Sequence, residues 1–375
     1  MMPFLLGGLT GAAFGVVLYK VGATRYSRVM GMLTLRDTKV MKFAFTAIAV
    51  ASLLYGAAAA LSLDEALHLV PRTMPFFGLA HVVGGVLFGI GMGVSGLCPG
   101  TCIAKAGGRG GDKRFVAPAA TLGLFVGVLL YAQLKQPLTD WGVIAASPRS
   151  LTLYGLLGLP YPVVALALGS LLLLVVYGLD RLTSEHRYEP AKQRQNVLDW
   201  IRGEWSWAAA GTAAGILVVL ATAQGGYLGF SGAILALTGW AAHLVGAPLE
   251  LVPKVNPDLI WRAALILGVF PGAWLAHFTA LPSKAAASLP VQKVTDLKAI
   301  AKGFGAATTM SLGAMIGGGC TTGAFISAWP TLSVGSFAMS LTFFVVSMAV
   351  SSTRLLVVHS LDLNQAQEVG DRVYD

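Results

Sequence analysis

Apolar runs of about twenty residues recur along this chain of 375 residues, and short basic stretches separate them. A helix of that length crosses the hydrocarbon core of a bilayer. Hydrophobic residues make up 55% of the chain and charged residues 11%, whereas soluble domains carry about 25% charge. So little charge cannot cover a water-facing surface. Because a helix satisfies its own backbone groups in lipid, the sequence predicts an all-α polytopic membrane protein.

The net charge of +9 arises from basic connections between the apolar runs. Basic loops stay on the cytoplasmic side, so this charge favours loops at a membrane over nucleic-acid binding. The basic connections are 20–42, 98–114, 180–204 and 282–302. Placing all four inside predicts a multi-pass inner-membrane protein with its N-terminus outside and its C-terminus in the cytoplasm.

Nine runs are expected to cross the membrane. They are 3–19, 43–63, 76–97, 115–134, 161–179, 208–223, 261–281, 303–319 and 334–356. Two further apolar pieces, 29–33 and 229–245, are short or interrupted by glycine, and we interpret them as re-entrant helices. If 229–245 crossed the bilayer, the four lysines of 282–302 would lie outside, against the positive-inside rule.

The two ends of the chain repeat one pattern: a span, a short piece, a span, a span that ends at a glycine-rich cysteine segment, and a last span. We predict a first half at 1–160 and a second half at 206–356, with a linking span and cytoplasmic linker at 161–205 and a cytoplasmic tail at 357–375. The single extra span inverts the second half, which predicts an hourglass-like inverted repeat. Broken helices at matching positions of such repeats indicate a transport site near the midplane.

All three cysteines lie in the two cysteine segments, 96–102 and 317–323. Three cysteines are too few for a disulfide framework. Cys98 and Cys320 occupy equivalent places, whereas Ala324 stands where a partner of Cys102 would be, so Cys102 is expected to pack in the core. A thiol at a helix start could donate weakly to a soft anion, act as a thiolate nucleophile, or pair with a neighbour in oxidation or metal binding.

The candidate substrate-binding residues are the two cysteines and their small or hydroxylated neighbours. They are Cys98, Pro99, Gly100, Thr101, Gly319, Cys320, Thr321 and Thr322. Proline suits the first position of a helix, where no amide hydrogen is needed, and helix N-termini attract anions. No carboxylate lies within a predicted span, and the sequence has no phosphate-binding loop. We therefore expect no catalytic residue, cofactor or metal, and we expect the histidines to be structural.

With Cys-Pro-Gly-Thr at 98–101 and Gly-Gly-Cys-Thr-Thr-Gly at 318–323, the chain resembles the YeeE/YedE family of sulfur-transport proteins. Residues 127–131 and 228–233 extend the resemblance, which covers most of the chain. It implies thiosulfate uptake across the inner membrane through an hourglass-shaped inverted repeat, with Cys98 and Cys320 as axial thiols. It also implies a small soluble sulfurtransferase as a cytoplasmic partner. Members with thiosulfate activity carry another cysteine shortly after the first span; residues 20–26 contain none, and Thr24 or Ser27 is the candidate replacement.

Three functions of different classes remain open at this point, and one of them is a structural or assembly membrane protein with no transported substrate. The leading one is transport of a small sulfur-containing anion, most simply thiosulfate, relayed by Cys98 and Cys320 through a narrow constriction. The alternative is a membrane thiol redox or persulfide-handling protein that uses Cys98 and Cys102. Alanine substitutions separate them, because transport needs Cys98 and Cys320 whereas the redox protein needs Cys98 and Cys102.

Overall fold

The computed structural model describes residues 1–69, 72–107, 116–145, 147–183, 201–280 and 297–359. Within these ranges the chain is helical, and its only β-type pairings are two isolated bridges. The longer helices are α1 (Met2–Val21), α3 (Lys39–Ala60), α4 (Ala80–Ser95), α6 (Val116–Asp140), α8 (Tyr161–Leu182), α10 (Trp207–Ala223), α11 (Phe230–Leu244), α12 (Pro257–Phe278), α13 (Leu297–Gly317) and α14 (Val334–His359). The shorter ones are α2 (Tyr26–Leu33), α5 (Pro99–Gly107), α7 (Leu153–Leu157) and the π-helix η2 (Thr321–Ser327).

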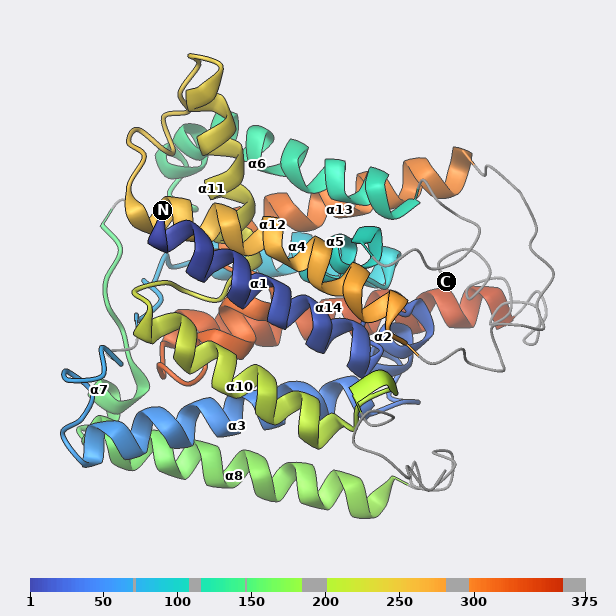
Figure 1. Cartoon of the computed structure of the whole chain (residues 1–375). Coiled ribbons are helices and arrows are strands. Elements are labelled where there is room, and N and C mark those ends of the chain that lie inside the picture. The colour runs from blue at the N-terminus through green and yellow to red at the C-terminus, as the bar shows by residue number, and fades with distance from the viewer. Residues whose placement is uncertain (70–71, 108–115, 146, 184–200, 281–296, 360–375) are drawn as a thin grey trace.

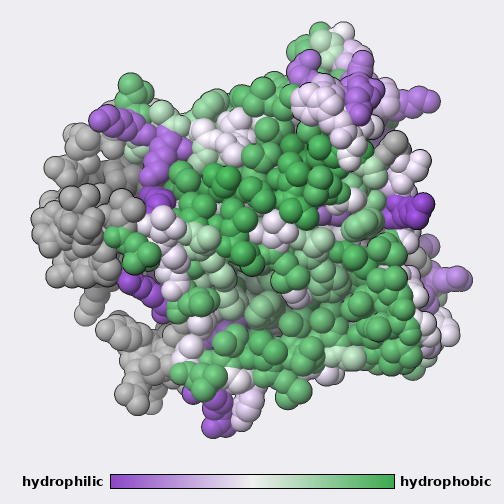
Figure 2. Space-filling view, turned by 180° about the vertical axis from the view of Figure 1, so that it is seen from behind, coloured by the Kyte–Doolittle hydropathy of each residue, from purple (hydrophilic) through white to green (hydrophobic). Residues whose placement is uncertain are grey.

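Seven helical segments are long and apolar enough to cross a membrane: α1, α3, α4 together with α5, α6, α8, α12 and α14. Most of the long helices run side by side (Figure 1). A broad hydrophobic surface covers the middle of the molecule, and hydrophilic residues gather at its two ends (Figure 2). The all-α polytopic membrane fold is thereby confirmed. Counting α10 and α13 as the remaining spans gives the nine expected, and the inner membrane and the direction of the termini remain predictions.

Charged residues at the helix ends correct the expected span boundaries. The sequence placed the start of the second span at Phe43, but α3 begins at Lys39 and buries the side chains of Lys39 and Lys42. Lys42 Nζ lies 3.1 Å from Asp180 Oδ1, in the last turn of α8. The expectation of no carboxylate within a span was therefore wrong at Asp180, which lies inside α8. Its lysine partner is 138 residues away in the sequence, so no local pattern indicates this ion pair.

The helices of the two halves contact one another in matching pairs. Helix α1 packs on α12 as α10 packs on α3, and α4 packs on α14 as α13 packs on α6. Helices α1 and α10 run in opposite directions, since Trp205 N donates to Lys20 O at one end and Thr10 Oγ1 donates to Gln224 Oε1 toward the other. In Figure 1, α2 lies toward the right-hand end and α11 toward the left-hand end. These pairings are what a two-fold inverted repeat produces, and the division at 1–160 and 206–356 remains our interpretation.

Close helix packing depends on glycine at two crossings. Along α1, a Cβ added at Gly11 would lie 1.9 Å from Leu265 O of α12. Between α4 and α13, a Cβ at Gly84 would lie 2.2 Å from Gly317 N and 2.5 Å from Gly313 O. Glycine at such contacts lets two helix backbones touch, which stabilises helix association in membranes. The second crossing brings together the two helices that lead into the cysteine segments.

Parts of the predicted basic loops lie outside the described residues. These are 108–115 of the loop 98–114, 184–200 of the linker, 281–296 of the loop 282–302 and 360–375 of the cytoplasmic tail.

Candidate functional site

The first cysteine segment follows α4, which ends at Gly96 with φ 63°. This is the left-handed conformation that glycine adopts readily, so the chain turns here and α5 begins at Pro99. Thr101 Oγ1 accepts a hydrogen bond from Cys98 N at 2.7 Å and donates to Cys98 O at 2.9 Å. Thr101 therefore stabilises the start of α5 and holds Cys98 in place. Cys98 itself is half-buried, whereas Cys102 is fully buried in the core.

The second cysteine segment follows α13 and begins the same way, with Gly318 at φ 84°. Here Cys320 is the N-cap of η2, and its Sγ accepts a hydrogen bond from Gly323 N at 3.5 Å. The sequence suggested a thiol beside the free amides of a helix start at Cys98. In the structure this arrangement occurs at Cys320, whose Sγ accepts the backbone hydrogen bond. Cys320 and Gly319 are buried, and Thr322 is 3% exposed.

Residues 226–231, the end of the α10–α11 connection together with the first two residues of α11, touch both cysteine segments. A Cβ at Gly100 would lie 2.4 Å from Phe230 Cε2, and Gly229 packs against Gly323 at the Cα atom. Tyr227 OH donates to Gly323 O at 2.5 Å, and Ser327 Oγ donates to Leu228 O at 2.6 Å. One short stretch of the second half therefore bridges the first cysteine segment and the second.

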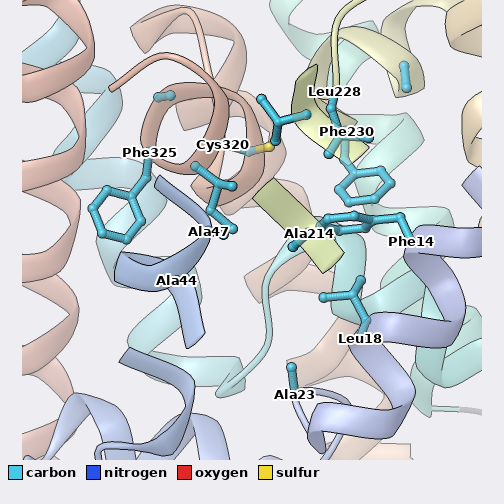
Figure 3. Packing of buried hydrophobic residues seen from close by; sticks show 14 of the residues in the cluster. Phe14, Leu18, Ala23, Ala44, Ala47, Ala214, Leu228, Phe230, Cys320 and Phe325 are labelled. Carbon is cyan, nitrogen blue, oxygen red and sulfur yellow. The ribbon is translucent and has the colours of Figure 1, made fainter. Parts of the chain in front are cut away.

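Apolar side chains fill the space between these segments. Figure 3 shows Cys320 facing the stretch that carries Leu228 and Phe230, with Phe14 of α1 against Phe230. The Phe14 and Phe230 ring centroids are 5.6 Å apart. Leu18 and Ala23 lie farther along, beyond Phe14 (Figure 3). All of these residues are at most 4% exposed, so the centre of the molecule is closed by hydrophobic groups.

Polar groups from the two cysteine segments meet at this closed centre. The Thr321 hydroxyl lies within hydrogen-bonding reach of the Cys98 thiol, and the Cys320 thiol lies within electrostatic range of it. Thr321 Oγ1 is buried, and its geometry falls short of a full hydrogen bond to any residue that the structure describes. The Cys98 thiol and the Thr321 hydroxyl therefore form a weakly bonded polar pair inside an apolar surrounding.

Side chains from other helices hold the ends of the two broken helices. His81 Nε2 accepts from Phe77 N at 2.9 Å, so its Nδ1 carries the hydrogen and donates to Gly317 O at 2.8 Å. Arg354 Nη1 donates to Gly93 O at 3.1 Å and Val94 O at 2.7 Å, at the end of α4. His81 is therefore structural, as expected.

A cavity of about 690 Å³ opens at the end of the molecule opposite Lys20. Its lining residues come from the α3–α4 connection, the end of α10 and the start of α12. They are Glu65, His68, Arg72, Thr222, Ala223, Gln224, Gly225, Gly226, Asp258 and Arg262. Asp258 lies in the first turn of α12, where the sequence suggested a loop, and it accepts from Arg262 Nε at 2.9 Å. Tyr227 follows Gly226 of this lining, and its hydroxyl donates to Gly323 O of the second cysteine segment.

The structure brings together most of the predicted site residues and separates one. The residues of 98–101 and 319–322 converge on the bridging stretch, whereas Thr24 lies beyond Ala23 in the α1–α2 connection and is 8% exposed. Sequence reasoning missed Tyr227, Phe230 and the cavity residues. Residues 228–233 had been noted only for a resemblance, and no local pattern pairs Phe230 with Gly100.

The three thiols are free cysteines. Within the described residues no group of three or more His, Cys, Asp or Glu side chains is arranged to hold a metal ion.

The family model described as sulphur transport matches residues 26–349, a range that contains both cysteine segments and the stretch between them. The chain belongs to the sulphur transport family. It is also 25% identical over 357 residues to a thiosulfate transporter, TsuA, from Spirochaeta thermophila; the match covers 90% of this chain and 94% of that protein. The resemblance to the YeeE/YedE family is thus confirmed, and with it a membrane protein of sulfur transport.

Proposed function

We propose that the protein carries a small sulfur-containing anion, thiosulfate in the first instance, into the cytoplasm through the closed centre between the two cysteine segments. The observation that carries the proposal is the approach of Cys98 of the first cysteine segment to the weakly bonded Thr321 hydroxyl and to Cys320 of the second. The thiosulfate transporter TsuA is similar along nearly its whole length, which supports this substrate.

The proposed path begins at the cavity, where the guanidinium groups of Arg72 and Arg262 can donate hydrogen bonds to an anion. Both arginines also lie near Asp258, so an anion competes with this carboxylate for them. From there the anion reaches Cys320, beside the free amides at the start of η2 and the hydroxyl of Thr321. A polarisable sulfur anion can accept weak hydrogen bonds from the thiols of Cys320 and then Cys98, which replace part of its water shell. The apolar groups Phe230 and Leu228 close the path when no anion is present.

Both cysteines act in this proposal as neutral hydrogen-bond donors, and no covalent bond forms. Pro99, Gly100 and Gly319 shape the backbone around them, and Thr101 and Thr322 keep the two helix starts in place. No catalytic residue, cofactor or metal is part of the proposal. A soluble sulfurtransferase on the cytoplasmic side is the proposed recipient of the anion.

The test is uptake of radiolabelled thiosulfate by cells that lack their own sulfate and thiosulfate uptake. We expect Cys98→Ala and Cys320→Ala each to reduce the uptake rate at least about tenfold, because each removes a donor from the relay. Cys102→Ala is expected to retain most of the rate, since Cys102 is buried in the core. Equal loss in Cys98→Ala and Cys102→Ala with an active Cys320→Ala would instead support the redox protein.

A further inference from the structure

A group of charges lies where the cytoplasmic linker meets the first helix, and we call Arg25, Arg28, Lys39 and Glu204 the inner cluster. The Glu204 carboxylate accepts from Lys39 Nζ at 2.7 Å, Arg25 Nη1 at 3.2 Å and Arg28 Nη2 at 3.3 Å. The three cations come from the starts of α2 and α3, and the carboxylate comes from the residues just before α10. Asp37 lies beside the cluster and its Oδ2 accepts from Arg28 Nη1 at 2.7 Å, so Arg28 is shared between two carboxylates. Lys39, Arg25 and the second arm of Arg28 converge on the Glu204 oxygens, and such a set of donors can bind an oxyanion.

The inner cluster is continuous with the first cysteine segment. Arg25 precedes Tyr26, and a Cβ at Gly96 would lie 2.5 Å from the Tyr26 ring. Gly96 is two residues before Cys98, and Thr24, the predicted donor, is next to Arg25. On the other side, Lys20 Nζ donates to Arg202 O and Trp205 N donates to Lys20 O, each at 2.8 Å. These bonds keep Glu204 at the end of α1, beyond Leu18 and Ala23.

Exposure separates the members of the inner cluster. The Lys39 side chain is only 6% exposed, whereas the Glu204 side chain is 31% exposed. Partial burial acts to raise the pKa of Glu204, but the charges of Arg25, Lys39 and Arg28 outweigh it and keep that pKa below its usual range. The carboxylate is therefore ionised and held by charge. An anion can reach its cationic partners through Arg25 and Arg28, whose side chains are 49% and 30% exposed.

We propose that the inner cluster is the release site for the transported anion, and that the Glu204 carboxylate is a tethered competitor that occupies it between transport events. This inference rests on the proposed function for the direction of flow. A small oxyanion of sulfur that leaves Cys98 displaces Glu204 from Lys39, Arg25 and Arg28. The carboxylate then returns and expels the anion into the cytoplasm, so that strong binding does not hold the anion at the exit.

A purely structural ion pair makes a different prediction. Removing one partner of a buried pair leaves an uncompensated charge and destabilises the fold, and a simple salt does not restore it. A true oxyanion site accepts a free anion in place of the missing carboxylate, and an anion that binds the folded state stabilises it by mass action. Rescue by an added oxyanion therefore distinguishes the two.

The experiment measures the thermal unfolding midpoint of the purified full-length protein in detergent, with sodium thiosulfate or sodium sulfate against sodium chloride at equal ionic strength. Glu204→Ala is expected to unfold several degrees below wild type in chloride. Millimolar thiosulfate is expected to restore at least half of that loss while shifting wild type much less. If Glu204→Ala does not fold, Glu204→Gln is measured in its place with the same expectation.

Asp180→Asn is the matched control, since it removes the carboxylate that pairs with Lys42, one turn along α3 from Lys39. The Lys42 side chain is 1% exposed, so an anion from solution cannot reach it and no rescue is expected. Lys39→Met combined with Glu204→Ala should abolish the rescue. Equal stabilisation of wild type, Glu204→Ala and Asp180→Asn by thiosulfate, or no stabilisation of Glu204→Ala, overturns the inference.

Uptake by Glu204→Gln tests the release step separately. A slower exit predicts a maximal thiosulfate uptake rate at least about threefold below wild type together with a lower half-saturation concentration, and an unchanged maximal rate overturns the release role. Absence of uptake by wild type would contradict the proposed function alone, because the rescue measurement on purified protein still decides whether the inner cluster binds oxyanions.

Discussion

The two cysteine segments hold equivalent places in the order of helices, yet they hold their thiols in different ways. In the first, a threonine hydroxyl stabilises the helix start and leaves Cys98 half-buried. In the second, the sulfur of Cys320 itself accepts from the helix start and is fully buried, while the hydroxyl of Thr321 makes no full hydrogen bond within the described residues. The comparison shows that equivalent motifs use their hydroxyls differently: Thr101 stabilises a helix start, whereas Thr321 makes no full hydrogen bond within the described residues.

Charge also differs between the halves. The α1–α2 connection carries Arg25 of the inner cluster, whereas the corresponding α10–α11 connection carries the uncharged Gln224, which accepts from Trp261 Nε1 at 3.0 Å. The α1–α2 connection is thus charged, whereas the corresponding α10–α11 connection carries a neutral side chain that lines the cavity together with Arg72 and Arg262.

The largest effect is expected where the two helices that lead into these segments cross. Gly84→Ala places a Cβ 2.2 Å from Gly317 N and 2.5 Å from Gly313 O, and backbone on both sides cannot yield as a side chain can. We expect a loss of at least about 3 kcal/mol, seen as little or no folded protein in fluorescence-detected size-exclusion chromatography. Gly178→Ala in α8 is the matched control, since it meets open space; equal loss in both variants would contradict the crossing as the cause.

The next effect compares the two helix ends. His81→Leu leaves Gly317 O and Phe77 N without their buried partner, and we expect a cost of about 2–4 kcal/mol. Arg354→Met frees carbonyl oxygens at the end of α4, where the half-buried arginine lets water replace it, so about 1 kcal/mol is expected. Chemical denaturation in detergent measures both. Similar costs would show that the two helix ends are held equally firmly.

A smaller effect separates the two threonines. Thr101→Val removes the partner of Cys98 N and is expected to cost about 1–2 kcal/mol. Thr321→Val removes a hydroxyl whose only contact to Cys98 falls short of a full hydrogen bond, so stability should change less than in Thr101→Val, while thiosulfate uptake falls. Thermal unfolding and uptake are measured on the same preparations. Loss of stability in Thr321→Val without loss of uptake would assign that hydroxyl to structure.

The smallest effect concerns pH at the inner cluster. Because the pKa of Glu204 is lower in the folded protein than its usual value, its stabilising contribution is fully present above about pH 4.3. It is lost only as the pH falls through the lower folded value. The difference in unfolding midpoint between wild type and Glu204→Gln should therefore stay constant from pH 8 to pH 5.5. A difference that changes within this window would contradict a lowered pKa of Glu204, because a carboxylate with a lowered pKa takes up no proton there.

The sequence was sufficient for the features that depend on composition and local order. Runs of apolar residues predicted the membrane helices, and glycine next to cysteine predicted the breaks at Gly96 and Gly318. The remaining features depend on partners far apart in the chain. Glu204 lies 179 residues from Arg25, and Lys42 lies 138 residues from Asp180, so no spacing indicates either pair. Nor does the sequence distinguish the α-helical start after Cys98 from the π-helix after Cys320.

The bridging stretch at 226–231 has a kinetic consequence. Since Phe230 touches Gly100 while Tyr227 and Gly229 touch Gly323, the two entrances cannot swing apart independently. On the path that we propose, passage would require rotamer changes of rings and aliphatic groups such as Phe230 and Leu228. We then expect turnover to resemble permeation along a saturable pore more than a rocking cycle, with a rate that depends only weakly on temperature.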